Sequence, residues 1–445
     1  MKSKTKLLIV LLAFLSTTWI TYGHDQVPAP PQDKPILLVN GTIHTVTGAT
    51  LDQGQLLFEN GKITAVRQSI EPPSNCEVID VSGKHVYPGL ISAISSIGLV
   101  EINSVNATID IGELTPFNPN LKAQVAVNPD SEIIPVTRAN GVLTAHVTPS
   151  TYQGGFIAGK TAVINLDGWT TEDLTLRAPT GMAVSWPRDP RLSGFHPEDP
   201  GNDNPAKAEE AYTKKIDELS DFLEEARAFE KAKAKGKSPL NVDLRLEAMI
   251  PVLNRELPVH IFANTARQIR DAVRWAESQE LRMVLMDGTD AWRVATLLQE
   301  KGIPVVIGGV NQLPSRRWES YDVRFTNAAK LHTAGVQFAI AYAGGGPVSS
   351  NERNLPYEAG KAVAHGLAPE EALKAITIYP AEILGVADRL GSLEIGKDAT
   401  LIVTTGNPLD IRSNVKMAFI QGRPVDLSSR HTQLYEKYQQ RYLQQ

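Results

Sequence analysis

The chain has 445 residues, of which 42% are hydrophobic, and it carries a formal net charge of -5 at pH 7. This length allows two or three domains, or one barrel of roughly 250 residues with a smaller domain beside it. The acidic balance excludes the basic face that nucleic-acid binding usually needs, so we expect no nucleic-acid partner.

Residues 1–23 indicate a secretory signal peptide. Lysines alternate through the first six residues and precede an apolar run at 7–15, which is too short for a comfortable membrane span. We therefore expect an exported protein, periplasmic or secreted, with no membrane span after signal cleavage. The alternative is an uncleaved N-terminal anchor. Residues 24–34 are rich in proline and polar side chains and are predicted to be a linker.

Cys76 is the single cysteine of the chain. Neither an intrachain disulfide nor a cluster of thiolate metal ligands can therefore form. The hydrophobic core has to hold the fold without covalent help, and we expect Cys76 to be an inert residue beside a strand.

The two ends of the chain have the same character. Residues 35–87 contain short β-rich runs with the hairpin dipeptides Asn40-Gly41 and Asn60-Gly61, and residues 386–430 contain similar runs. We predict that both ends contribute to one composite β-sandwich domain. A helix is predicted over residues 431–445.

Residues 88–385 alternate short apolar runs with amphipathic helical patterns, most regularly in the second half. This pattern predicts the α/β fold class, specifically a parallel (β/α)8 TIM-like barrel. The eight predicted strands are Leu90–Ile97, Val142–Thr148, Thr161–Leu166, Met182–Trp186, Val259–Phe262, Met283–Met286, Pro304–Ile307 and Phe338–Ala341.

A charged segment at about 188–240 interrupts this alternation. Alanine, leucine and phenylalanine recur at helical spacing within it, so we predict an inserted, exposed helix. It would be either a lid or partner surface, or simply a solvated charged face.

The stretch 87–96 reads Tyr-Pro-Gly-Leu-Ile-Ser-Ala-Ile-Ser-Ser. It resembles the approach to the first barrel strand in the amidohydrolase superfamily, the imidazolonepropionase-like branch in particular, where Pro-Gly-Leu-Ile leads into Asp-Ala-His-x-His. Residues 372–385 and 391–399 also resemble family stretches, and 119–142 resembles an exported subgroup with variable ligand positions. The resemblance covers 35–422 and implies the split sandwich as well as the barrel.

The resemblance also implies where a catalytic zinc or another divalent metal would bind, and this chain departs from the family there. Ser92 stands where aspartate is usual. The five ligand positions are occupied by Ile94, Ser96, Phe262, Asp287 and Ala343. Four of these side chains cannot supply the family's chemistry, and one carboxylate cannot hold a catalytic zinc alone. We therefore expect no metal site and no cofactor.

Polar residues remain near the predicted mouth. His146 and Asp287 are catalytic candidates as a metal-free base dyad, and His260 is a third candidate if it reaches the mouth. Both histidines are otherwise expected to be buried in the barrel core. The substrate-binding candidates are Asn264, Asp290, Asn351, Glu352, Arg353 and Asn354.

Three functions fit this pattern. By resemblance, the chain is a hydrolase of carbon–nitrogen bonds other than peptide bonds in small amides, with activity made doubtful by the replaced ligands. The alternative is an inactive barrel that binds a small molecule or pairs with an active paralogue, and a third is a structural subunit of an envelope complex. A homodimer is also expected to be possible.

Overall fold

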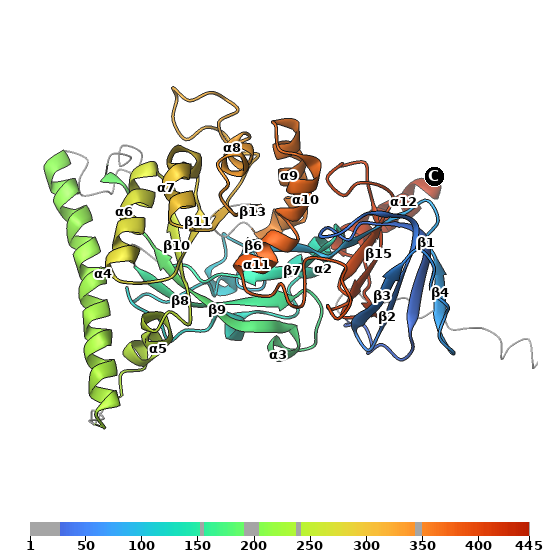
Figure 1. The fold of residues 1–445 in the computed structure, drawn as a ribbon, viewed down its shortest axis with the longest axis horizontal. Helices are drawn as coiled ribbons and strands as arrows, with labels where there is room; N and C mark the ends of the chain where they lie inside the picture. The colour runs from blue at the N-terminus through green and yellow to red at the C-terminus, as the bar shows by residue number, and fades with distance from the viewer. Residues whose placement is uncertain (1–26, 152–154, 191–203, 237–241, 343–348, 445) are drawn as a thin grey trace, which may run out of the picture.

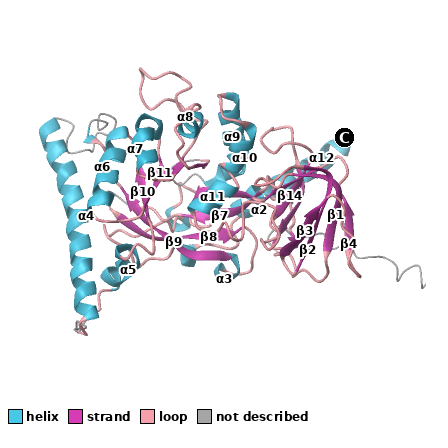
Figure 2. Ribbon diagram, viewed as in Figure 1, coloured by secondary structure: helices cyan, strands magenta, loops and turns pink. Residues whose placement is uncertain are grey.

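The computed structural model describes residues 27–151, 155–190, 204–236, 242–342 and 349–444. The predicted signal peptide at 1–23, part of the predicted linker and Ala343 lie outside these described residues. Two eight-stranded sheets lie side by side along the long axis of the molecule, with helices around one of them (Figures 1 and 2).

The smaller domain is a sheet built from both ends of the chain. Its strands are β1 (Ile36–Ile43), β2 (Leu51–Glu59), β3 (Lys62–Arg67), β4 (Glu77–Asp80), β5 (His85–Pro88), β14 (Leu401–Thr404), β15 (Val415–Ile420) and β16 (Arg423–Pro424). The order is β16-β15-β14-β5-β1-β2-β3, with β4 paired to β1. The antiparallel β14–β5 pair joins the two ends, with Leu401 opposite Pro88.

The larger sheet forms a nearly closed barrel. Its strands are β6 (Leu90–Ser95), β7 (Val142–Val147), β8 (Ile157–Asn165), β9 (Thr175–Ser185), β10 (Val259–Ala263), β11 (Met283–Asp287), β12 (Val305–Ile307) and β13 (Phe338–Ile340), in that order. Each of the eight predicted apolar runs overlaps one of these strands, which confirms the predicted α/β barrel. Between β13 and β6, the N–H groups of Ile340 and Ile91 donate to the carbonyls of Ala375 and Ile376.

The prediction of an all-parallel barrel is wrong at one strand. β8 runs antiparallel to both β7 and β9, while the remaining pairs are parallel. The connections on either side of β8 are short, and a parallel crossover needs a dozen or more residues. Antiparallel pairing is what such short connections allow.

Helices surround the barrel, and α4 lies at the end of the molecule farthest from the small sheet (Figure 1). The longer helices are α4 (Pro205–Ala234), α5 (Leu244–Leu253), α6 (Ala266–Ser278), α9 (Leu355–Ala364) and α12 (Arg430–Leu443). The short ones are α2 (Ile133–Arg138), α3 (Thr171–Leu174), α7 (Ala295–Glu300), α8 (Asn327–Thr333), α10 (Pro369–Lys374), α11 (Ile378–Ile383), η1 (Asn106–Thr108), η2 (Ala123–Ala126), η4 (Ala291–Val294) and η5 (Ser349–Asn354). No described helix is both long enough and apolar enough to cross a membrane.

The inserted helix α4 is one-sided. Asn204 caps its first turn by accepting hydrogen bonds from the N–H groups of Ala206 and Lys207. Its buried side chains are Tyr212, Leu219, Phe222, Leu223, Ala226 and Phe229, and all of them except Phe229 belong to the main hydrophobic core. The helix therefore packs against the barrel along one face and exposes its charged residues on the other.

Alternation along the strands separates the barrel interior from its outer face. Val259, Ile261 and Ala263 of β10 join the main core outside the barrel, whereas Phe262 packs in a small separate cluster. That cluster otherwise consists of Ala93, Ile94, Val284, Met286, Val306, Ala339, Ala341 and Ile383. Because successive side chains of a strand point to opposite faces, this cluster is the interior of the barrel.

Candidate functional site: the barrel mouth

The carboxyl ends of β10 and β11 place three polar side chains together. Asn264 Nδ2 donates a 2.7 Å hydrogen bond to Asp287 Oδ2, and Asn264 Oδ1 accepts a 2.5 Å bond from Thr289 Oγ1. Asp287 has a φ of 76°, in the left-handed region that aspartate and asparagine tolerate better than most residues. The backbone therefore turns at the end of β11, at the barrel rim. Asn264 and Asp287, both predicted to lie near the mouth, are in contact there.

Asp287 is an unusual carboxyl group because it is held mainly by a neutral partner. Burial raises its pKa, while the Asn264 hydrogen bond and the positive charge of Arg324 act against that rise without cancelling it. A carboxyl group with a raised pKa at a rim is a candidate for proton transfer or for donating a hydrogen bond.

Asp290 has a structural role. Its carboxylate accepts bonds of 3.0 and 2.6 Å from the two terminal nitrogens of Arg316, and one of 3.1 Å from the Ala266 N–H. Burial acts to raise the pKa of Asp290, but these bonds outweigh it and the net shift is downward. Because both oxygens of the Asp290 carboxylate accept these hydrogen bonds, the carboxylate holds Arg316 and the start of α6 in place. We therefore do not assign Asp290 to ligand binding.

The family's metal-ligand positions do not assemble a metal site. Ile94 and Phe262 pack with Met286 in the apolar interior cluster, and Phe262 lies opposite Met286 in the parallel β10–β11 register. Ser96 is buried, and its hydroxyl has no hydrogen-bond partner. Hydrocarbon side chains cannot coordinate a cation, so the donor set does not fit zinc.

Within the described part of the chain, no group of three or more His, Cys, Asp or Glu side chains could hold a metal ion. Ala343, the fifth ligand position, lies outside that part, and its methyl side chain offers no donor atom.

His146 and His260 lie inside the barrel, below the mouth. Both are fully buried, and their rings meet edge to face with centroids 5.1 Å apart. His146 Nδ1 lies 2.9 Å from the Ala93 carbonyl oxygen, and His260 Nδ1 lies 3.3 Å from Thr161 Oγ1. Neither Nε2 atom has a hydrogen-bond partner. These are core histidines, the alternative that the sequence left open.

Burial also decides the charge of this histidine pair. It lowers the pKa of His146 to about 4, against the opposing effect of the Ala93 carbonyl. Burial, followed by the proximity of His146, lowers the pKa of His260 well below its ordinary value. No hydrogen bond joins His146 to Asp287 among the described residues, so the structure does not bring the proposed dyad together.

Glu352 is bound by two serines of the first barrel strand. Its carboxylate accepts hydrogen bonds of 2.7 Å from Ser92 Oγ and 2.9 Å from Ser95 Oγ, and it is 3% exposed. Burial raises its pKa to about 7, although both serines and the Ser96 N–H act in the opposite direction. Glu352 therefore anchors η5 to the first barrel strand.

The other substrate-binding candidates in η5 make contacts elsewhere or are exposed. The Arg353 guanidinium lies 2.7 Å from Nδ1 of His431, and its carbonyl accepts a hydrogen bond from Asn140. Asn351 is exposed, and Asn354 leads into α9 as its N-terminal residue without a side-chain capping bond. Within the described residues, no hydrogen bond joins any of these three side chains to Asn264 or Asp287.

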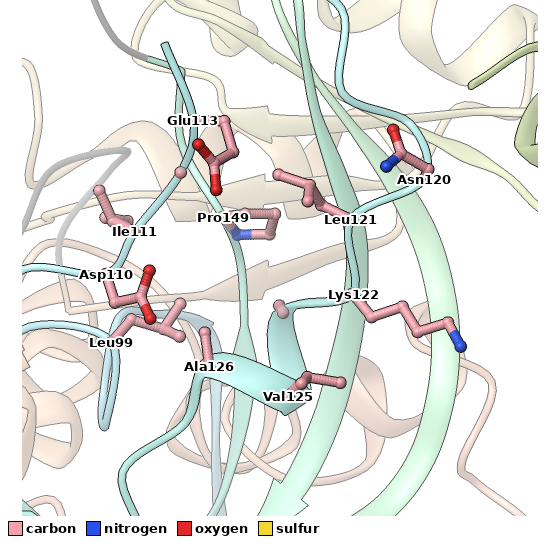
Figure 3. Close-up of a pocket in the computed structure, with 12 residues that line it drawn as sticks. Leu99, Asp110, Ile111, Glu113, Asn120, Leu121, Lys122, Val125, Ala126 and Pro149 are labelled. Carbon is pink, nitrogen blue, oxygen red and sulfur yellow. The ribbon is translucent and has the colours of Figure 1, made fainter. Parts of the chain in front are cut away.

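A cavity of about 380 Å³ opens beside the ends of β6 and β7 (Figure 3). Asp110 and Glu113 lie on one wall, and Leu121 and Lys122 lie on the other. The remaining lining residues are Leu99, Ile111, Gly112, Asn120, Ala123, Val125, Ala126 and Pro149. The long segment after β6 therefore builds a hollow next to the mouth, large enough for a small molecule.

Arg324 is the residue at this mouth that the sequence did not reveal. Arg324 Nη1 donates a 2.9 Å hydrogen bond to Thr289 Oγ1, which links Arg324 to Asn264 and Asp287. The cluster of Arg316, Arg317 and Arg324 after the seventh barrel strand was the available signal. Only the three-dimensional structure shows that the two arginines have different partners. Arg316 forms an ion pair with Asp290, whereas Arg324 binds Thr289.

Comparison with known proteins gives a consistent picture. The profile of the Amidohydrolase family matches residues 206–425. The amidohydrolase tasK of Hapsidospora irregularis is 22% identical over 415 residues, which cover 85% of this chain. The match spans only 41% of the length of that relative.

Solved structures share the fold. An amidohydrolase from Thermotoga maritima superposes with a TM-score of 0.77 at 29% identity, covering 88% of this chain and 99% of the other. A prolidase complexed with N-methylphosphonate-L-proline superposes with a TM-score of 0.53 at 17% identity, covering 88% of this chain and 100% of the other. The second likeness bears on the fold alone.

Proposed function

The chain belongs to the amidohydrolase superfamily, a group of hydrolases, and on that premise we propose that its barrel mouth binds small amides without the metal-assisted hydrolysis of its relatives. The inherited ligand class is molecules with a carbon–nitrogen bond other than a peptide bond. One observation carries the proposal. Ile94 and Phe262 occupy ligand positions in an apolar cluster, while Asn264 and Asp287 keep the rim polar.

The physical argument separates binding from turnover. A catalytic zinc lowers the pKa of its bound water toward about 7 and polarises the carbonyl that is attacked. Nothing in the cluster around Ile94 and Phe262 can hold such an ion. The paired amide and carboxyl of Asn264 and Asp287 can still exchange hydrogen bonds with an amide ligand, because each group offers donors or acceptors at the rim.

A second candidate function is metal-free hydrolysis of the same amides. The raised pKa of Asp287 favours it, because a carboxyl group titrating closer to neutrality can pass a proton to a leaving nitrogen. Its partner in that step would not be His146, which lies apart from it in the core.

Calorimetry and product assays with the purified protein separate the two candidates. We expect hydantoin-like and acyl-amino-acid compounds to bind without ammonia, amine or carboxylate release. Turnover that disappears in Asp287→Asn, with binding retained, would establish the second candidate instead. A protein that neither binds nor hydrolyses any of these amides would refute both, and would favour the structural-subunit function.

A further inference from the structure

Arg324 is a half-buried guanidinium with only neutral hydrogen-bond partners. It donates a 2.9 Å hydrogen bond to Thr289 Oγ1 and a 3.2 Å hydrogen bond to Ser315 Oγ. Its Nε is buried without a hydrogen-bond partner. A guanidinium has five N–H donors in a planar fork, so most of these donors remain uncommitted. Burial lowers the pKa of Arg324 although nearby acidic groups act to raise it.

Two neighbouring arginines form ion pairs with carboxylates, which Arg324 does not do within the described residues. Arg316 forms ion pairs with Asp290 and Glu319, and Arg293 pairs with the same two carboxylates. Arg324 forms no ion pair within the part of the chain that the structure describes. A half-buried cation that no carboxylate contacts directly is destabilising unless another anion pairs with it.

The surroundings of Arg324 place it at the mouth. Its partner Thr289 follows Asp287 and Gly288 at the end of β11. Asn327 in α8 donates from Nδ2 to the carbonyls of Gly288 and Thr289, and its Oδ1 is buried without a hydrogen-bond partner. One rim position therefore offers a cationic donor and a spare amide acceptor beside Asp287.

We infer that Arg324 binds the carboxylate of the ligand, so that the preferred amides are acylated amino acids or similar amides with a free carboxylate. The inference rests on the proposed function and specifies its ligand class. Arginine suits this role because its fork matches the two carboxylate oxygens. Burial raises the pKa of Asp287, which lessens the repulsion between its carboxyl group and such a ligand.

Isothermal titration tests this with three matched probes: N-acetyl-L-leucine, N-acetyl-L-leucinamide and 4-methylpentanoate. The leucinamide lacks the carboxylate, and the pentanoate lacks the amide. We expect wild-type protein to bind the acid at least about 10-fold more tightly than the leucinamide. Arg324→Gln should weaken binding of both carboxylates about 10- to 100-fold, as expected for lost charge-assisted hydrogen bonds.

Two further variants keep the test decisive. Arg324→Lys retains the charge but not the fork and should restore only part of the affinity. Arg412→Gln removes an exposed arginine that pairs with Asp410 in the small domain, and should leave binding unchanged. Circular dichroism and thermal melting check that the Arg324 variants are folded.

The outcomes distinguish the two proposals. Equal binding of acid and leucinamide, unaffected by Arg324→Gln, would overturn the role of Arg324 and leave small-amide binding intact. Binding of 4-methylpentanoate that depends on Arg324, with no contribution from the amide group, would keep the anion site and refute small-amide binding. Absence of binding by all three probes would overturn both.

Discussion

Ser92 Oγ donates a 2.7 Å hydrogen bond to Glu352 Oε2, joining residues that are 260 positions apart. Ser92 stands where the superfamily has an aspartate ahead of its two metal-binding histidines. Here that position helps solvate a carboxyl group from the loop after the last barrel strand. The first strand therefore anchors η5 through Ser92 and Ser95, and this contact agrees with the proposal that the mouth binds ligands without a metal.

The Glu352 anchor predicts a specific pH dependence of stability. The pKa of Glu352 is raised to about 7 in the folded protein, above its ordinary value of 4.5, so the native state binds the proton more tightly. The resulting stability is complete below pH 4.5 and is lost as the pH rises through about 7. The loss is on the order of 3 kcal/mol.

Glu352→Gln removes this titration. Urea unfolding midpoints between about pH 5 and pH 8 should vary less in the variant than in wild type. Glu358, whose pKa burial also raises to about 7, leaves part of the slope in place. Glu300→Gln, at an exposed carboxyl, is the control. An unchanged slope in Glu352→Gln would show that the anchor does not titrate.

Gly181 makes room for the buried imidazole of His260. A Cβ built at Gly181 would overlap three atoms of the His260 ring, which is fixed in the barrel core. Gly181→Ala should therefore lower the free energy of unfolding by about 1–3 kcal/mol, measured by chemical denaturation. Gly48→Ala, in an exposed turn, should change it by less than about 0.5 kcal/mol. Equal effects would contradict the packing described for His260.

The Arg138–Asp167 ion pair joins α2 to the end of β8. Its 2.8 Å bond lies between side chains that are 3% and 2% exposed, and Arg423 approaches the same carboxylate at 3.3 Å. Asp167→Ala would leave the buried Arg138 guanidinium without this partner and should cost about 3–5 kcal/mol.

An exposed pair provides the control for that loss. Asp410→Ala breaks the Arg412–Asp410 pair, whose side chains are 87% and 38% exposed, and should cost far less than the loss of the buried pair. Thermal and urea unfolding of both variants measure the difference. Similar small losses in the two variants would mean that the buried pair contributes little to stability.

The sequence predicted the barrel well because buried strands leave a local signal. Each predicted apolar run overlaps a strand, and Asn60-Gly61 joins β2 to β3 as a hairpin turn. Asn40-Gly41 makes no hairpin turn, because it lies inside β1, where the β1–β2 register shifts. The direction of β8 was missed, because an apolar run has the same composition in either direction. The direction of β8 depends on the lengths of the connections before and after it, and the hydrophobic pattern does not report those lengths.

Site residues were harder to predict because their partners are distant in sequence. Asn264 and Asp287 are adjacent because β10 and β11 pair in parallel, so their meeting followed from the fold. The sequence predicted Glu352 to contact a ligand, whereas the structure shows its carboxylate buried and hydrogen-bonded to two serines of the first strand. Arg324 differs from Arg316 only by which carboxylates lie nearby, and no local pattern carries that information.

Metal content of the purified protein is the most direct measurement of the central claim. After exposure to excess zinc and removal of free ions, inductively coupled plasma mass spectrometry should find far less than one zinc per chain, because hydrocarbon side chains occupy the ligand positions Ile94 and Phe262. About one tightly bound zinc per chain would contradict the account.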